Sequence, residues 1–220
     1  MRGLPILTLD ERVLSPRFGY VFQARWVEPY ESVLGMLWKF VRANRLSGAA
    51  VVAQIGTAPI DPYEGLEPVA TQVDCRVVAR LLQIRLSSVV AGLLRPHQDR
   101  RTAFKYCARC LAWGYHGIIH QAEGHRVCPV HRCAMHERCR HCRQPFVFRL
   151  DAELLDAPFR CPSCRCYLAS AMGRAHGTSL PARLEQLSFV LRLRRRPPYE
   201  HQASRARHPA LTAEGLTPLD

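Results

Sequence analysis

The chain has 220 residues, a formal net charge of +13 and 10 cysteines, a length that suits one sizeable domain or two small ones. It contains no uninterrupted apolar run of about 18 residues, which argues against a membrane span, and Met1 to Pro5 do not open a secretory signal. Paired cysteines in such a chain favour metal binding over a secreted disulfide scaffold, so we expect a cytoplasmic protein.

Residues 1–98 predict an N-terminal helical domain. Residues 1–30 show no clean periodicity and predict an extended arm. Ser32 is a suitable N-cap for a helix that would stop between residues 44 and 48. Apolar residues recur within it at helical spacing: Leu34, Leu37, Trp38 and Val41. We expect Trp38 to lie in the core.

Residues 49–73 are dense in proline and glycine, with Pro59, Pro62 and Pro68 among them. Such density is typical of loops and short turns. We therefore expect a loop here, anchored to the core by its apolar residues.

Two short helices around a turn are predicted next, an arrangement typical of a helix-turn-helix unit. Asp74 would cap the first helix, and Ser87 would cap the second after a break at residues 83–86. The second helix offers Ser87, Ser88 and Arg95 but no Asn, Gln or Lys for reading bases. Phosphate or protein contact is therefore favoured over base reading, and plain helix packing is an equal alternative.

Residues 99–170 predict two tandem zinc-ribbon-like fingers. Four pairs of metal-ligand residues occur here, each with two residues between its members: Cys107/Cys110, Cys128/His131, Cys139/Cys142 and Cys161/Cys164. One tight turn can present such a pair to one cation, and two turns complete the tetrahedral shell of zinc. The spacing between turns is close to that of zinc ribbons.

The spacing favours sequential pairing, which gives a Cys₃His site followed by a Cys₄ site. An interleaved pairing, with the first pair joined to the third, stays open. In either case protein ligands fill every position, so we expect two structural Zn²⁺ ions and no catalytic metal. Cys75, Cys133 and Cys166 are left without a role.

Arginine supplies nearly all of the positive charge, and its planar guanidinium suits phosphate and carboxylate groups. Nucleic acid is therefore the first partner to consider, and a solvated basic surface is the alternative. The candidate contacts to nucleic acid or a partner protein are Arg100, Arg101, Lys105, Arg138, Arg140 and Arg143.

Residues 171–220 predict a basic helix from Ser179 to Arg196 followed by a flexible tail. Pro197 and Pro198 would stop the helix. Its expected apolar stripe consists of Leu184, Leu187, Val190 and Leu191.

The segment Cys128-Pro-Val-His131-Arg-Cys-Ala-Met135-His-Glu-Arg-Cys139-Arg-His-Cys142 resembles the signature of the TniQ family, roughly C-P-x-H-x₃-L-x₃-C-x₂-C. Met135 stands where that signature has Leu. Upstream, Tyr106-Cys107-Ala-Arg-Cys110-Leu111 is similar to the first cysteine turn of the family.

The N-terminal part also resembles that family, though less specifically. Glu31-Ser32-Val-Leu34 is similar to an E-S-L element, and residues 78–87 are similar to the helix-turn-helix of the family. The resemblance spans residues 28–166 and leaves out the tail after residue 170.

This resemblance implies a non-catalytic accessory protein of bacterial transposition. Proteins of this family help to choose the insertion site and engage an AAA+ ATPase that assembles on target DNA and recruits the transposase. In CRISPR-associated transposons they also link that ATPase to an effector with a guide RNA. Several members are dimers, but nothing in this sequence determines whether the chain forms a homodimer.

Three other classes of zinc protein fit the sequence less well. Zinc deaminases need P-C-x-x-C, whereas this chain has Cys-Pro at both relevant turns. Zincins need H-E-x-x-H, but here the second histidine, His141, lies one residue too far from His136. A RING-type ubiquitin ligase has the same ligand order but a shorter gap than the one from His131 to Cys139. A zinc-dependent transcription regulator needs base-reading side chains that the predicted helices lack.

Overall fold

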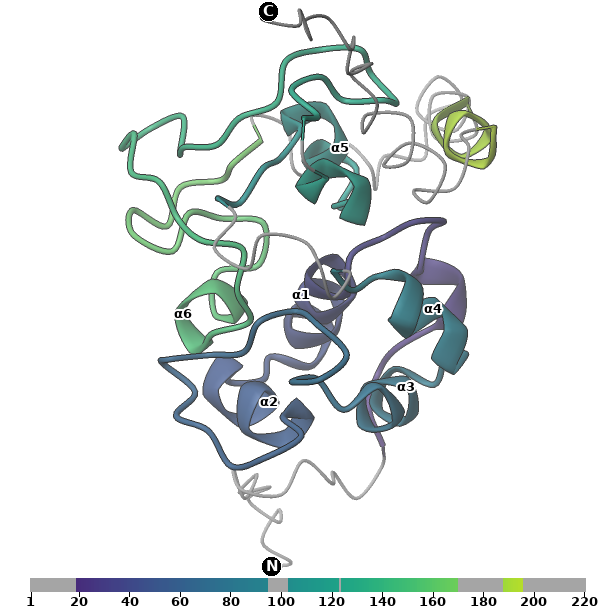
Figure 1. Cartoon of the computed structure of the whole chain (residues 1–220), viewed down its shortest axis with the longest axis vertical. Helices are drawn as coiled ribbons and strands as arrows, with labels where there is room; N and C mark the ends of the chain where they lie inside the picture. The colour runs from purple at the N-terminus through teal and green to yellow at the C-terminus, as the bar shows by residue number, and fades with distance from the viewer. Residues whose placement is uncertain (1–18, 95–102, 123, 170–187, 196–220) are drawn as a thin grey trace, which may run out of the picture.

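The computed structural model describes residues 19–94, 103–122, 124–169 and 188–195. These residues form short helices joined by loops, and the pairing between extended segments is limited to isolated β-bridges within the described ranges. Figure 1 shows α1 to α4 gathered at one end and the cysteine-rich loops with α5 at the other. The predicted mainly helical fold class is therefore confirmed.

The first helix, α1 (Val33–Asn44), begins and ends as the sequence predicts. The Ser32 hydroxyl accepts a hydrogen bond from the Gly35 amide at 3.1 Å, which satisfies a free N–H of the first turn. The helix ends at Asn44 and is followed by the C-cap Arg45, whose φ of 51° lies in the left-handed region. Trp38 is fully buried, as expected, and so is Phe40.

The prediction of a loop over residues 49–73 is wrong at its start, because α2 (Gly48–Ile55) is a helix. Val51, Val52 and Ile55 are all buried and form its apolar face, while the prolines lie beyond its end. At Gly48 a Cβ would collide with the Ala152 carbonyl oxygen. Glycine is required there because α2 packs directly against α6 (Ala152–Leu155).

The two helices expected after Asp74 are α3 (Cys75–Leu82) and α4 (Leu86–Ala91), which pack against each other. The Asp74 carboxylate accepts hydrogen bonds from the first-turn amides, which confirms the predicted cap. The predicted cap at Ser87 is wrong: α4 already begins at Leu86, preceded by Arg85 without a side-chain cap. The pair is present, and its identity as a helix-turn-helix stays a prediction.

Three further short helices are described, one before α1 and two in the cysteine-rich region. They are η1 (Ala24–Trp26), α5 (Ala108–Ala112) and η2 (Ile118–Gln121). Of the helix predicted from Ser179 to Arg196, residues 188–194 are helical, Arg195 lies in a turn, and the other positions lie outside the described residues. The expected apolar stripe is wrong there, because Leu191 is 43% exposed while Phe189 and Leu193 are buried.

One hydrophobic core joins the N-terminal helices to the second half of the cysteine-rich region. Trp38 of α1 donates its indole N–H to the Leu154 carbonyl in α6 at 2.7 Å, and its ring lies 5.0 Å from that of Phe159. The same core contains the thiols of Cys139 and Cys161. The core thus crosses the boundary at residue 98, and the division into residues 1–98, 99–170 and 171–220 stays a prediction.

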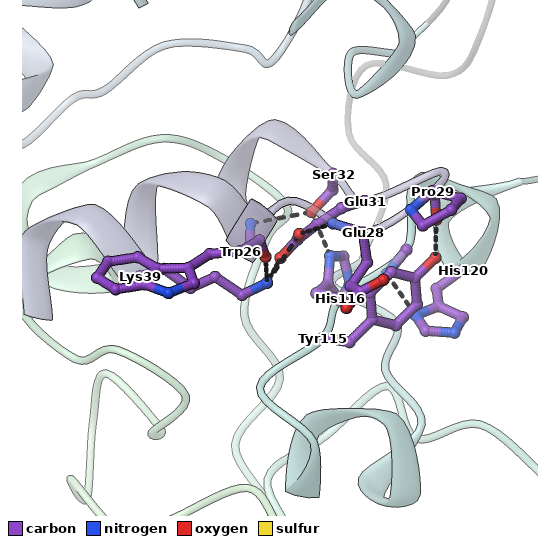
Figure 2. A network of polar contacts seen from close by, with 11 residues as sticks. Trp26, Glu28, Pro29, Glu31, Ser32, Lys39, Tyr115, His116 and His120 are labelled. Carbon is purple, nitrogen blue, oxygen red and sulfur yellow. Dashed lines mark hydrogen bonds and ion pairs between the residues drawn. The ribbon is translucent and has the colours of Figure 1, made fainter. Parts of the chain in front are cut away.

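A buried polar network also ties α1 to the loop after α5 (Figure 2). The Nε2 of His116 donates to the Lys105 carbonyl at 2.9 Å, so Nδ1 is left to accept from the Ser32 hydroxyl at 2.6 Å. Burial lowers the pKa of His116 to about 3 and keeps the ring neutral.

Beside this network Lys39 and Glu31 form an ion pair at 2.8 Å. The Lys39 ammonium also donates to the Trp26 carbonyl, which fixes the segment that leads into α1. Burial raises the pKa of Glu31, and Lys39 opposes that shift. Replacing one partner would leave the other charge buried without compensation.

Candidate metal centres

The first cysteine-rich site is built from two turns that face each other. Cys107 and Cys110 come from the start of α5, and Cys128 and His131 come from a turn beyond η2. The Cys110 and Cys128 sulfurs lie 3.6 Å apart, and Nδ1 of His131 lies 3.2 Å from the Cys110 sulfur. A tetrahedral zinc ion with Zn–S bonds of about 2.3 Å separates two sulfurs by roughly 3.8 Å. The site therefore has the dimensions of a four-coordinate metal centre.

The second site repeats this geometry with four thiols. The Cys139 and Cys164 sulfurs are 3.6 Å apart, and those of Cys142 and Cys161 are 3.7 Å apart. In each site the four ligand atoms lie within 4.8 Å of one another. The ligands are therefore grouped sequentially along the chain. The chain does not adopt the interleaved pairing. These eight ligands therefore do not form the cross-brace that a RING-type ligase requires.

The chemistry of the donors fits a bound cation at each site. The three cysteine ligands of the first site are fully buried. Burial raises the pKa of the Cys110 thiol well above its ordinary value, because a thiolate without water or a cation is poorly stabilised. A divalent metal ion offsets that cost and deprotonates its ligands. Each group is thus compatible with one structural metal ion, and all four positions are supplied by the protein.

Three of the four ligand turns share one backbone conformation. In all four turns the residue after the second ligand donates its amide to the carbonyl of the first, but only in three is that residue an arginine in the left-handed region: Arg132, Arg143 and Arg165. These arginines have φ values of 54°, 64° and 60°. The left-handed region is normally left to glycine, and a residue with a side chain pays roughly 1–2 kcal/mol there.

Arg143→Gly is expected to stabilise the protein by roughly 0.5–1 kcal/mol. The substitution removes the left-handed strain, and the extra freedom of glycine in the unfolded chain cancels part of the gain. Arg140→Gly is the matched control, because Arg140 has no positive φ and should only lose stability. Urea unfolding of the metal-loaded proteins measures both, and a destabilised Arg143→Gly would contradict the assigned strain.

Two further side chains touch the first site without belonging to its ligand set. The Cys133 sulfur lies 3.5 Å from that of Cys107. His120 is fully buried, and because its Nδ1 accepts from the Gly117 amide at 3.3 Å, its Nε2 carries the proton toward the Cys128 sulfur at 3.8 Å. Sequence reasoning gave neither residue a specific role, because one contact depends on where η2 places His120 and the other on how the turn from Cys128 to Cys133 faces Cys107.

The predicted basic contacts are brought together only in part. Arg138, Arg140 and Arg143 are exposed around the turn that carries Cys139 and Cys142. Lys105 is half-buried, and its ammonium donates to the Ala122 carbonyl at 3.4 Å. Arg100 and Arg101 lie outside the described residues. Three candidate cations therefore share one turn of the second site, whereas the ammonium of Lys105 is tied to the residue that follows η2.

No protein-family model matches the chain, and no curated protein matches it either. Among the helices that the structure describes, none combines the length and apolar character needed to cross a bilayer.

Proposed function

We propose that the chain is a non-catalytic adaptor in bacterial DNA transposition, of the TniQ type, which links target-site selection to an AAA+ ATPase and the transposase. One observation carries the proposal. The ligand sets are complete without water or substrate, and the second set is built into the core that holds α1. Such metal centres stiffen a binding scaffold and leave no open coordination position for catalysis.

The metal in both sites is proposed to be Zn²⁺. Thiolate and imidazole donors in a closed tetrahedral arrangement suit zinc, and the sulfur separations agree with its bond lengths. The ions would contribute to folding, because a site of this kind does not exist before the chain folds around it.

The helix pair α3 and α4 is proposed as a helix-turn-helix unit used for protein contact. Leu86 and Val90 of α4 lie one helical turn apart, are 43% and 50% exposed, and form its outward face. This outward face carries no group suited to reading base edges. It suits the surface of a partner protein, such as the ATPase or, in a CRISPR-associated system, an effector with its guide RNA.

Direct contact with target DNA is assigned to Arg138, Arg140 and Arg143. Exposed arginines on one rigid turn bind phosphates without reading sequence, so the binding should be tolerant of sequence and sensitive to salt. A sharp consensus site in a binding assay on random duplexes would instead support the transcription-regulator alternative.

Charge reversal of these three arginines to Glu is expected to abolish co-sedimentation of the chain with ATPase–DNA filaments, while metal content stays unchanged. The matched control reverses Arg42, Arg45 and Arg126, which are also exposed but lie outside α3, α4 and the turn of the second site, and should co-sediment as before. Co-sedimentation that survives the first set of reversals would remove these arginines from the interface. Loss with both sets would show a general charge effect in place of a specific surface.

A further inference from the structure

The described part of the C-terminal helix lies beside the first metal site. Residues 188–194 are drawn in yellow next to α5 in Figure 1. Phe189 and Leu193, one helical turn apart, are 2% and 1% exposed, and they share a small hydrophobic cluster with Cys107, Cys110 and Cys128. This cluster is separate from the core around α1, so the buried apolar side chains of the helix pack onto the first site.

Phe189 makes the central contacts of this packing. Its ring stacks on the imidazole of His131, with centroids 5.7 Å apart and an angle of 21° between the planes. It also stacks on Trp113 at 6.0 Å and meets Tyr115 edge-on at 5.5 Å. A metal ligand is thus held between its own turn and a ring that lies 58 positions further along the sequence.

We propose that Phe189 is a positioning residue of the first metal site, and that metal binding at this site and docking of the basic helix stabilise each other. The stack holds the His131 imidazole in the orientation in which Nδ1 faces the three sulfurs. Residues that contact a metal ligand from outside the coordination shell commonly orient it in this way. In return, a bound ion fixes the imidazole face on which Phe189 rests. Coupling of this kind is reciprocal, so each event must strengthen the other.

The docked helix also reaches the N-terminal segment and α4. Arg194, Val190, Glu28 and Ser87 line a common cavity of about 650 Å³. Burial raises the pKa of Glu28, and the nearby charges of Lys39 and Arg194 oppose that shift. The first metal site therefore determines the position of the helix arginines relative to α4. This consequence does not depend on which partner the protein binds.

Metal release from the full chain tests the first half of the proposal. Phe189→Ala is expected to speed the transfer of one of the two zinc ions to a chromogenic chelator by about tenfold, with the other ion released at the wild-type rate. Leu191→Ala, an exposed position on the same helix, should release both ions as the wild type does. Unchanged release from Phe189→Ala would overturn the proposal, and so would equal acceleration of both ions.

Limited trypsin digestion tests the reverse direction. Cys110→Ser removes a ligand of the first site without altering Phe189, and it should speed cleavage after Arg192 and Arg194 several-fold. Phe189→Ala should show the same faster cleavage with the metal ligands intact. Cleavage at wild-type rates in Cys110→Ser, once its first site is shown to be metal-free, would disprove the coupling.

Discussion

Replacing Cys161 by serine is expected to unfold the whole chain, and not only the loop that carries it. Cys161 and its partner ligand Cys139 lie in the same core as α1 and α2. A structural zinc site contributes on the order of 10–16 kcal/mol of apparent binding free energy, whereas a domain of this size has about 5–15 kcal/mol of net stability. The free energy lost with the second metal ion therefore exceeds the stability that the remaining contacts can supply.

Amide hydrogen exchange of α1 measures this effect, because α1 is remote in sequence from the substituted residue. In Cys161→Ser we expect α1 to exchange at rates near those of an unfolded chain. Cys110→Ser is the control, because its site belongs to the separate cluster beneath Phe189, and it should leave α1 protected. Wild-type protection of α1 in a Cys161→Ser protein that has lost its metal would show that the core does not depend on the second site.

Trp38→Ala is expected to cost about 3–5 kcal/mol of unfolding free energy, the largest effect for any residue outside the metal sites. Trp38 is fully buried, and its ring is close to those of Phe104 and Phe159. Its indole N–H also satisfies the Leu154 carbonyl at 2.7 Å. The substitution removes an interlocking ring and leaves a buried acceptor without its partner.

Urea unfolding of the metal-loaded protein gives this cost directly. Trp38→Phe separates the two contributions, since it keeps much of the ring packing and should lose only about 1–3 kcal/mol for the unpaired carbonyl. Trp113→Ala serves as the comparison at the first site, where the side chain is only half-buried, and should cost less than Trp38→Ala. A loss below about 1 kcal/mol for Trp38→Ala would contradict the role of this residue as the joint between α1 and α6.

The metal ligands could be predicted from the sequence because their geometry is local. Two ligands separated by two residues sit on one turn, and that turn forms with the same backbone hydrogen bonds at Cys128, Cys139 and Cys161. The caps at Ser32 and Asp74 were predictable for the same reason. Each depends on a residue and its neighbours within one helical turn.

The parts that sequence reasoning missed depend on distant contacts. Val51, Val52 and Ile55 have a helical spacing, but the composition of the segment is dominated by the prolines that follow them. The helix α2 is stabilised by its packing on α6, which lies far along the sequence. On the C-terminal helix, Val190 and Leu191 are as apolar as Phe189 and Leu193. Which pair is buried depends on the surface of the first site, and that surface is formed by residues outside the helix.

Native mass spectrometry of the purified chain, combined with amide hydrogen exchange of the same sample, tests most directly whether two inert metal ions stabilise this fold. The account predicts two zinc ions per folded chain, and loss of α1 protection when a chelator strips the second ion. A folded chain that carries no metal would contradict it. A metal ion with an exchangeable water in its coordination shell would contradict it equally.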